Sequence, residues 1–259
     1  MLVKETLASG MRVWHARPDT GDPRPAVLLL HERYGPVPYS FDAIEKLAGD
    51  GFVACVYDMF HRYQGDRRPI EQAQARVDPT DDEALADLDE TIAYLRKLPY
   101  VDGDRIGMAG FCLSGRTPLV YAAARDDVSA IAVFHGGIYP RDYEASMPGQ
   151  QTVAGLIPRL SCPVLGGFGE HDNLVPLENV RRFRGELERH GRSFEIRVFA
   201  NVPHAWLNHT TDAYRKREAD EAWAMMVRFF TEVFDGTWDG QTVARFQADP
   251  SIAFDFALA

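Results

Sequence analysis

The 259-residue sequence has few cysteines, and its N-terminus has no long hydrophobic run. Its only cysteines are Cys55, Cys112 and Cys162, an odd number that does not suggest a disulfide framework and that fits a reducing compartment. Three scattered cysteines are also too few for a structural zinc site. The N-terminus has no apolar run behind a basic start, so we expect neither a signal peptide nor a membrane anchor. These absences predict a soluble, cytoplasmic protein.

Positive charge is also in short supply. The chain carries 28 basic and 38 acidic side chains, a formal net charge of −10. Such a balance repels phosphate backbones and anionic lipid surfaces, so we expect no nucleic acid and no membrane as partner. A chain of this length with 46% hydrophobic residues can bury one large core.

Short apolar runs alternate along the chain with longer segments whose apolar residues recur every three or four positions. Most of the short runs are apolar throughout, which is typical of strands covered on both faces. The pattern predicts an α/β fold with a mainly parallel sheet and helices on both faces. The predicted strands are 26–31, 52–58, 105–111, 130–136, 163–169 and 194–200. The predicted helices are roughly 40–50, 82–98, 114–125, 177–190 and 212–234.

Three segments depart from this alternation. Residues 2–16 predict an antiparallel pair at one edge of the sheet. The long connections 59–80 and 137–160 are expected to line a site, as long loops of a compact domain usually do. We expect one domain over 1–234 and a tail over 235–259, which packs either on the body or on a second subunit, so that the protein is a monomer or a homodimer. The aromatic residues of the tail are Trp238, Phe246, Phe254 and Phe256.

Polar side chains follow four of the predicted strands. His31 and Glu32 follow the first, and Cys112, Asp172 and His204 follow three later ones. Because ligands of an open parallel sheet bind beyond the carboxyl ends of its strands, we expect these side chains to gather at one edge. Their order along the chain is nucleophile, acid, histidine, which is the triad order of hydrolases with a nucleophile elbow.

The stretch "GFCLSG" has the spacing of such an elbow. A nucleophile pushed out of the sheet edge needs small neighbours two positions before and three after it, which here are Gly110 and Gly115. The turn also places Cys112 at a helix start, where the dipole lowers the pKa of a thiol. His204 can then take the proton and Asp172 can orient the imidazole. A buried structural cysteine is the alternative, and it is our expectation for Cys55 and Cys162.

The segments "HERYG", "GFCLSG", "GEHDNLVP" and "NVPHAW" make residues 2–234 resemble the dienelactone hydrolase family, the cysteine branch of the α/β-hydrolase fold. The resemblance implies that Cys112 is the nucleophile and that Asp172 and His204 complete the triad. It also implies that Glu32 holds the resting thiol and accepts its proton when substrate arrives.

The same resemblance implies an oxyanion hole made by the backbone N–H groups of Leu113 and Arg33. The reaction implied is hydrolysis of a small ester or lactone through an acyl-thioester intermediate, with no metal or organic cofactor.

Two positions depart from the pattern of the family. Ser114 replaces a glycine of the cysteine motif, where a small residue still fits. Asn208 stands where the family has a carboxylate-binding arginine, and a neutral amide lacks the charge-assisted, bidentate grip of a guanidinium. The second carboxylate-binding arginine of the family lies in the loop before the predicted helix 82–98. Arg67, Arg68 and Arg76 are the candidates for it in this sequence.

The substrate implied by these departures is less polar than a dienelactone, and an aromatic ester is one example. Tyr34 and Trp206 lie beside catalytic candidates, and the long connections add Phe60, Tyr63, Tyr139 and Tyr143. A thioester, an amide or a carbon–carbon bond would suit the same residues. The alternative from another class is a non-hydrolytic, small-molecule-binding or redox-responsive protein whose activated thiol is oxidised.

Overall fold

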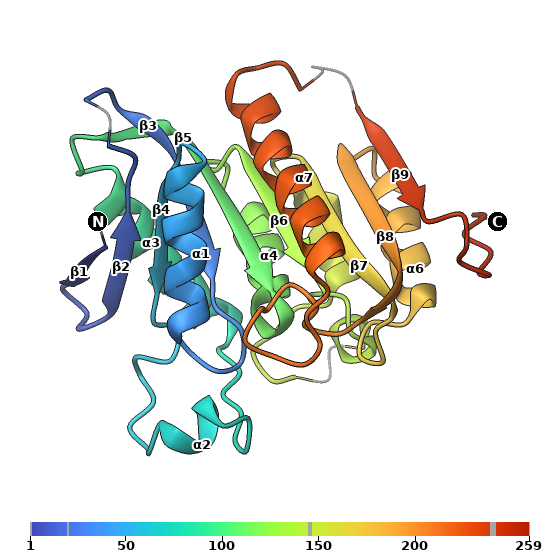
Figure 1. The fold of residues 1–259 in the computed structure, drawn as a ribbon, viewed down its shortest axis with the longest axis horizontal. Coiled ribbons are helices and arrows are strands. Elements are labelled where there is room, and N and C mark those ends of the chain that lie inside the picture. Colours follow the sequence, from blue (N-terminus) through green and yellow to red (C-terminus); the bar gives the residue numbers. More distant parts are fainter. Residues whose placement is uncertain (1, 20, 145–146, 239–241, 259) are drawn as a thin grey trace.

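The protein, seen here as a computed structural model, is described over residues 2–19, 21–144, 147–238 and 242–258. A nine-stranded sheet with the order β1-β2-β4-β3-β5-β6-β7-β8-β9 runs through it (Figure 1). The pairs β1–β2 and β2–β4 are antiparallel, and all other neighbouring pairs are parallel. The strands are β1 Val3–Thr6, β2 Arg12–Ala16, β3 Arg24–Leu30, β4 Val53–Tyr57, β5 Val101–Phe111, β6 Ala130–Phe134, β7 Val164–His171, β8 Phe194–Pro203 and β9 Ala244–Ala248.

Helices cover both faces of the sheet, with α1 and α7 on one face and α3, α4 and α6 on the other (Figure 1). The main helices are α1 Pro38–Gly49, α3 Asp81–Leu95, α4 Thr117–Ala124, α6 Leu177–Arg189 and α7 Lys216–Phe234. Two short helices, α2 Arg68–Glu71 and α5 Val153–Leu156, lie in the long connections. None of the helices in the described ranges is long and apolar enough to cross a lipid bilayer.

The strands are apolar at every position because helices cover both faces of the sheet. In β3, Val27 and Leu29 join the core cluster that includes α1 and α7. Leu28 and Leu30 join the cluster that includes α3, α4 and α6. Successive side chains of a strand point to opposite faces, so a strand between two helical layers needs apolar residues at every position. The predicted α/β fold, with its antiparallel N-terminal edge, is confirmed.

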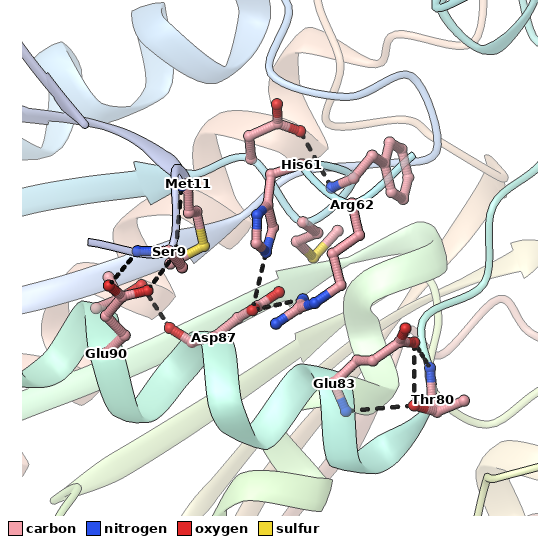
Figure 2. Close-up of polar contacts among 12 residues, drawn as sticks. Ser9, Met11, His61, Arg62, Thr80, Glu83, Asp87 and Glu90 are labelled. Atoms are coloured by element: carbon pink, nitrogen blue, oxygen red, sulfur yellow. Dashed lines mark hydrogen bonds and ion pairs between the residues drawn. The ribbon is translucent and has the colours of Figure 1, made fainter. Parts of the chain in front are cut away.

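Helix α3 holds two segments from the N-terminal part of the chain through polar contacts (Figure 2). His61, in the long connection after β4, lies with Nε2 3.0 Å from Oδ1 of the buried Asp87. In the turn between β1 and β2, the Ser9 N–H donates to Glu90 Oε1 at 3.0 Å. The first turn of α3 is closed by a capping box between Thr80 and Glu83. One well-capped helix therefore fixes both segments.

The C-terminal tail packs on the body of the molecule. Its strand β9 pairs with β8 at the edge of the sheet, and its aromatic rings form a small cluster. The Phe246 and Phe256 ring centroids lie 5.0 Å apart, and Trp238 contacts Phe229 of α7 at 5.1 Å. The sequence pattern did not predict β9, because "ARFQA" is short and mostly exposed.

Candidate active site

Cys112 lies on a sharp turn between β5 and α4. Its φ is +53°, in the left-handed region, and a short 3₁₀ turn, Cys112–Arg116, precedes the α-helix that the sequence predicts from residue 114. A Cβ at Gly110 would lie 2.4 Å from the Ser114 carbonyl oxygen, and a Cβ at Gly115 would lie 2.7 Å from the carbonyl carbon of Gly136. Only glycine fits either position without a shift of the backbone, as the spacing of the motif predicted.

Ser114 takes part in this turn through its side chain. Its hydroxyl accepts the Phe111 N–H at 3.0 Å and donates to the Leu30 carbonyl oxygen at 2.9 Å. The serine that replaces a glycine of the motif is thus small enough to fit. It also ties the turn to the end of β3.

Three side chains from the ends of three strands form a hydrogen-bonded chain. The Cys112 Sγ lies 3.2 Å from His204 Nε2, and His204 Nδ1 lies 2.8 Å from Asp172 Oδ2. The other oxygen of Asp172 accepts the N–H groups of Leu174 and Val175 at 2.8 and 3.0 Å. These bonds hold the carboxylate, which in turn orients the imidazole.

The surroundings of His204 favour its charged form. Burial alone would lower its pKa, but the hydrogen bonds to Asp172 and Cys112 outweigh burial and raise the pKa to about 10. These hydrogen bonds therefore favour the imidazolium form of His204. The side chain of His204 is 15% exposed and Cys112 is 7% exposed, so the sulfur lies just below the surface.

Glu32 lies beside this chain but has a different partner. The side-chain N–H of Asn208 donates to Glu32 Oε2, and both residues are almost fully buried. Burial raises the pKa of Glu32 to about 7, against the opposing effects of the Asn208 hydrogen bond and the charge of His204. Asn208, at the position of the family's arginine, therefore holds a carboxyl group of the protein itself.

This raised pKa has a cost in stability. The folded-state pKa, about 7, exceeds the ordinary value of 4.5, so the folded state loses stability as the pH rises from 4.5 through 7. Glu32→Gln is expected to stabilise the fold by ~3 kcal/mol above pH 7, and the gain should vanish near pH 4.5. Urea unfolding at several pH values measures this, with the exposed Glu45→Gln as control. A gain that does not depend on pH would contradict the assignment.

His31 has a structural role. The Met59 N–H donates to its Nε2 at 3.1 Å, so its Nδ1–H donates to the Glu32 carbonyl oxygen at 2.7 Å. Burial lowers the pKa of His31 to about 4, which keeps the ring neutral. The ring therefore links the loop after β3 to the loop after β4.

Each of the three candidate arginines before α3 is paired with a carboxylate. The pairs are Arg67 with Asp58 at 3.1 Å, Arg68 with Asp66 at 2.8 Å and Arg76 with Asp78 at 2.6 Å. The guanidinium of Arg33 donates to the Ala73 carbonyl oxygen at 3.0 Å. A ligand carboxylate would have to compete with these partners.

Of the aromatic candidates, Tyr139 and Tyr34 lie near the nucleophile. Burial and its hydrogen bond with Cys112 raise the pKa of Tyr139, and its ring centroid lies 6.3 Å from that of His204. Tyr34 is half-buried, and burial and the nearby Glu32 raise its pKa. Trp206 is fully buried against Phe199, with ring centroids 4.8 Å apart, so it packs in the core instead of facing solvent.

Both long connections border the turn that carries the nucleophile. Met59 from the first and Asp142 from the second line a cavity of about 30 Å³ together with Leu113. The first connection also forms an open groove of about 240 Å³ that includes Phe60 and Tyr63. The first of these cavities therefore brings both loops against Leu113, the residue that follows the nucleophile.

His135 is a residue at this edge that the sequence argument missed. It follows β6 with φ +38° and is fully buried, and its ring centroid lies 5.1 Å from that of His204. The rule that singled out Cys112, a polar residue directly after an apolar strand, applies equally to "AVFHG" and would have found it. Within the described ranges, no group of three or more His, Cys, Asp or Glu side chains is arranged to hold a metal ion.

The fold and the elbow at the end of β5 define an α/β-hydrolase. The family model described as "Dienelactone hydrolase family" matches residues 11–234. The chain belongs to this family and is a dienelactone hydrolase-like hydrolase. The tail with β9 lies beyond the matched residues.

Individual relatives agree with this assignment. A "Putative carboxymethylenebutenolidase" of Methylorubrum extorquens is 27% identical over 224 residues, which are 85% of this chain and 76% of the relative. A "Probable 2-oxo-3-(5-oxofuran-2-ylidene)propanoate lactonase" of a Bradyrhizobium species is 30% identical, over 80% of this chain and 84% of the relative. The crystal structure of a "Putative Dienelactone Hydrolase" of Klebsiella pneumoniae superposes with a TM-score of 0.81 at 25% identity, over 90% of this chain and 98% of that one.

Proposed function

We propose that the protein hydrolyses small, uncharged esters or lactones with Cys112 as nucleophile. The observation that carries the proposal is the hydrogen-bonded chain from the Cys112 sulfur through His204 to Asp172. The curated relatives include a lactonase, which supports an ester-type bond as the target.

The mechanism begins with a thiolate–imidazolium pair, which the raised pKa of His204 supports. The sulfur attacks the carbonyl carbon, and the backbone N–H groups of Leu113 and Arg33 stabilise the oxyanion. His204 donates its proton to the leaving alkoxide, and a thioester remains on Cys112. His204 then takes a proton from water, whose oxygen attacks the thioester, and the acid leaves as the thiolate returns. Glu32 accepts the thiol proton when the resting sulfur carries one.

The proposed substrate is uncharged because the side chains that the sequence offered for binding a carboxylate already have partners inside the protein. Asn208 is bound to Glu32, and Arg67, Arg68 and Arg76 are paired with aspartates. Tyr34 and Tyr139, near the sulfur, suit an apolar or aromatic acyl group. An anionic substrate would lose its hydration here without gaining a charged partner from these residues.

This argument predicts a substrate preference. The kcat/KM for short p-nitrophenyl esters is expected to exceed that for the same esters with a carboxylate on the acyl chain by ~10-fold or more, since one unmatched charge costs at least ~1.4 kcal/mol. A panel in which the two classes differ only in the carboxylate measures this. A clear preference for the carboxylated compounds would overturn the uncharged substrate but not the nucleophile.

The function itself is tested by intact-mass spectrometry with an activated ester. We expect acyl transfer that maps to Cys112, followed by loss of the acyl group and turnover. A folded protein that shows neither would contradict the hydrolase mechanism. If mild peroxide then oxidised Cys112 ahead of Cys162, the redox-responsive alternative would be favoured.

A further inference from the structure

Four buried polar atoms lie unpaired behind the nucleophile. They are Glu32 Oε1, both ring nitrogens of His135 and Trp206 Nε1, and none has a hydrogen-bond partner among the described residues. Glu32 is 3% exposed, and His135 and Trp206 are fully buried. An unpaired buried polar group costs about 1–3 kcal/mol, so several such atoms in one place indicate a ligand.

The geometry identifies that ligand. His135 Nε2 lies 3.9 Å from Glu32 Oε1, which is too far for a direct hydrogen bond. A single water placed to one side of this line reaches both atoms at about 2.8 Å. The Trp206 ring centroid lies 6.4 Å from that of His135, and its Nε1–H is a further buried donor without a partner among the described residues. Buried waters characteristically have two to four polar partners, about the number found here.

His135 cannot easily move to close the gap. It has φ +38°, and a Cβ on the next residue, Gly136, would lie 1.9 Å from the Cys112 carbonyl oxygen. The backbone at the end of β6 is therefore packed directly against the turn that carries the nucleophile. Strained residues of this kind persist only where the surrounding structure holds them in place.

We propose that Glu32, His135 and Trp206 enclose one bound water molecule, through which His135 positions Glu32 as an ionisable group beside the nucleophile. The water accepts the Nε2–H of His135 and donates to Glu32 Oε1. Asn208 holds the other oxygen of the carboxylate. His135 is thus a positioning residue, and its effect on activity rests on the proposed function of Glu32.

The effect of His135 on the pKa of Glu32 depends on all the groups that surround this carboxyl. These are the imidazole of His204, the amide of Asn208, the hydroxyls of Tyr34 and Tyr39 and the ring of His135. Burial and the charge of His204 lower the pKa of His135, so its ring stays neutral. A neutral donor acting through water favours the ionised carboxylate, and its loss raises the pKa of Glu32 further.

The test uses a matched pair of variants. His135→Phe keeps the ring but removes both nitrogens, whereas His135→Gln places a polar atom near the position of Nε2. We expect His135→Phe to move the acidic limb of the kcat/KM profile upward by about one pH unit relative to the unmodified protein. In His135→Gln the same limb should lie within about 0.3 unit of its position in the unmodified protein. Equal shifts in both variants, or none in either, would overturn the positioning role.

Two measurements that do not need activity complete the test. A crystal structure of the unmodified protein should show a water within hydrogen-bond distance of Glu32 Oε1 and His135 Nε2; a dry site would overturn the proposal. Infrared titration of the protonated carboxyl band, assigned with Glu32→Gln, should show the same pKa shift in His135→Phe. If the protein hydrolysed no ester, the proposed function would fail, while these two results would still decide the water site.

Discussion

Replacing Cys112 with serine is expected to reduce kcat by about 10³-fold, because the hydroxyl must lose its proton to a general base in each turnover. The sulfur lies 3.2 Å from a histidine whose pKa of about 10 favours a pre-formed imidazolium. A serine hydroxyl has a much higher pKa and cannot form that ion pair at neutral pH. Steady-state kinetics with a p-nitrophenyl ester, together with thermal unfolding, measures the effect.

The matched control is Cys162→Ser. Cys162 is half-buried, and burial raises its thiol pKa to about 12. It lies just before the start of β7, whereas Asp172 directly follows the end of the same strand. This variant is expected to keep full activity. If Cys112→Ser also kept full activity with an unchanged fold, the acidity of the thiol would have no role in the reaction.

Replacing Asp172 with asparagine is expected to reduce kcat by about 10³–10⁴-fold. The carboxylate accepts His204 Nδ1–H at 2.8 Å and is itself held by two backbone N–H groups, so the amide would occupy the same place without the charge. Loss of the negative charge should lower the pKa of His204 from about 10 and allow the tautomer of His204 that lacks the Nδ1–H. Both the pH profile and an NMR titration of the imidazole report this change.

The exposed Asp66→Asn is the control for this substitution. Asp66 pairs with Arg68, whose side chain is 80% exposed, and such pairs contribute little to stability. We expect it to alter neither kcat nor the titration of His204. An Asp172→Asn protein with full activity would remove Asp172 from the mechanism.

The sequence predicted the edge of the sheet at which the site lies, because the signals are local. Cys112, Asp172 and His204 each follow an apolar strand, and in a parallel sheet the carboxyl ends of the strands meet. The small residues around Cys112 follow from the same local geometry. Their distances in the structure agree with the predicted triad, whose catalytic roles stay a proposal.

The partners of Glu32 could not be predicted in this way. Its hydrogen bond to Asn208 joins residues 176 positions apart, and its approach to His135 depends on the relative placement of β3 and β6. Neither contact leaves a periodic or spacing signal in the chain. Trp206 was a candidate for substrate binding because it is close to His204 in the sequence. That closeness does not determine which way the indole points. Such details depend on tertiary packing.

The contact between Gly136 and the carbonyl of Cys112 has a kinetic consequence. Since the Cys112 carbonyl is packed against Gly136, the unfavourable φ of Cys112 is imposed once, when the chain folds, and is not renewed at each catalytic cycle. The acylated and free forms of the enzyme should then share one backbone conformation. Reorganisation of this turn would contribute nothing to the barrier for either half of the reaction.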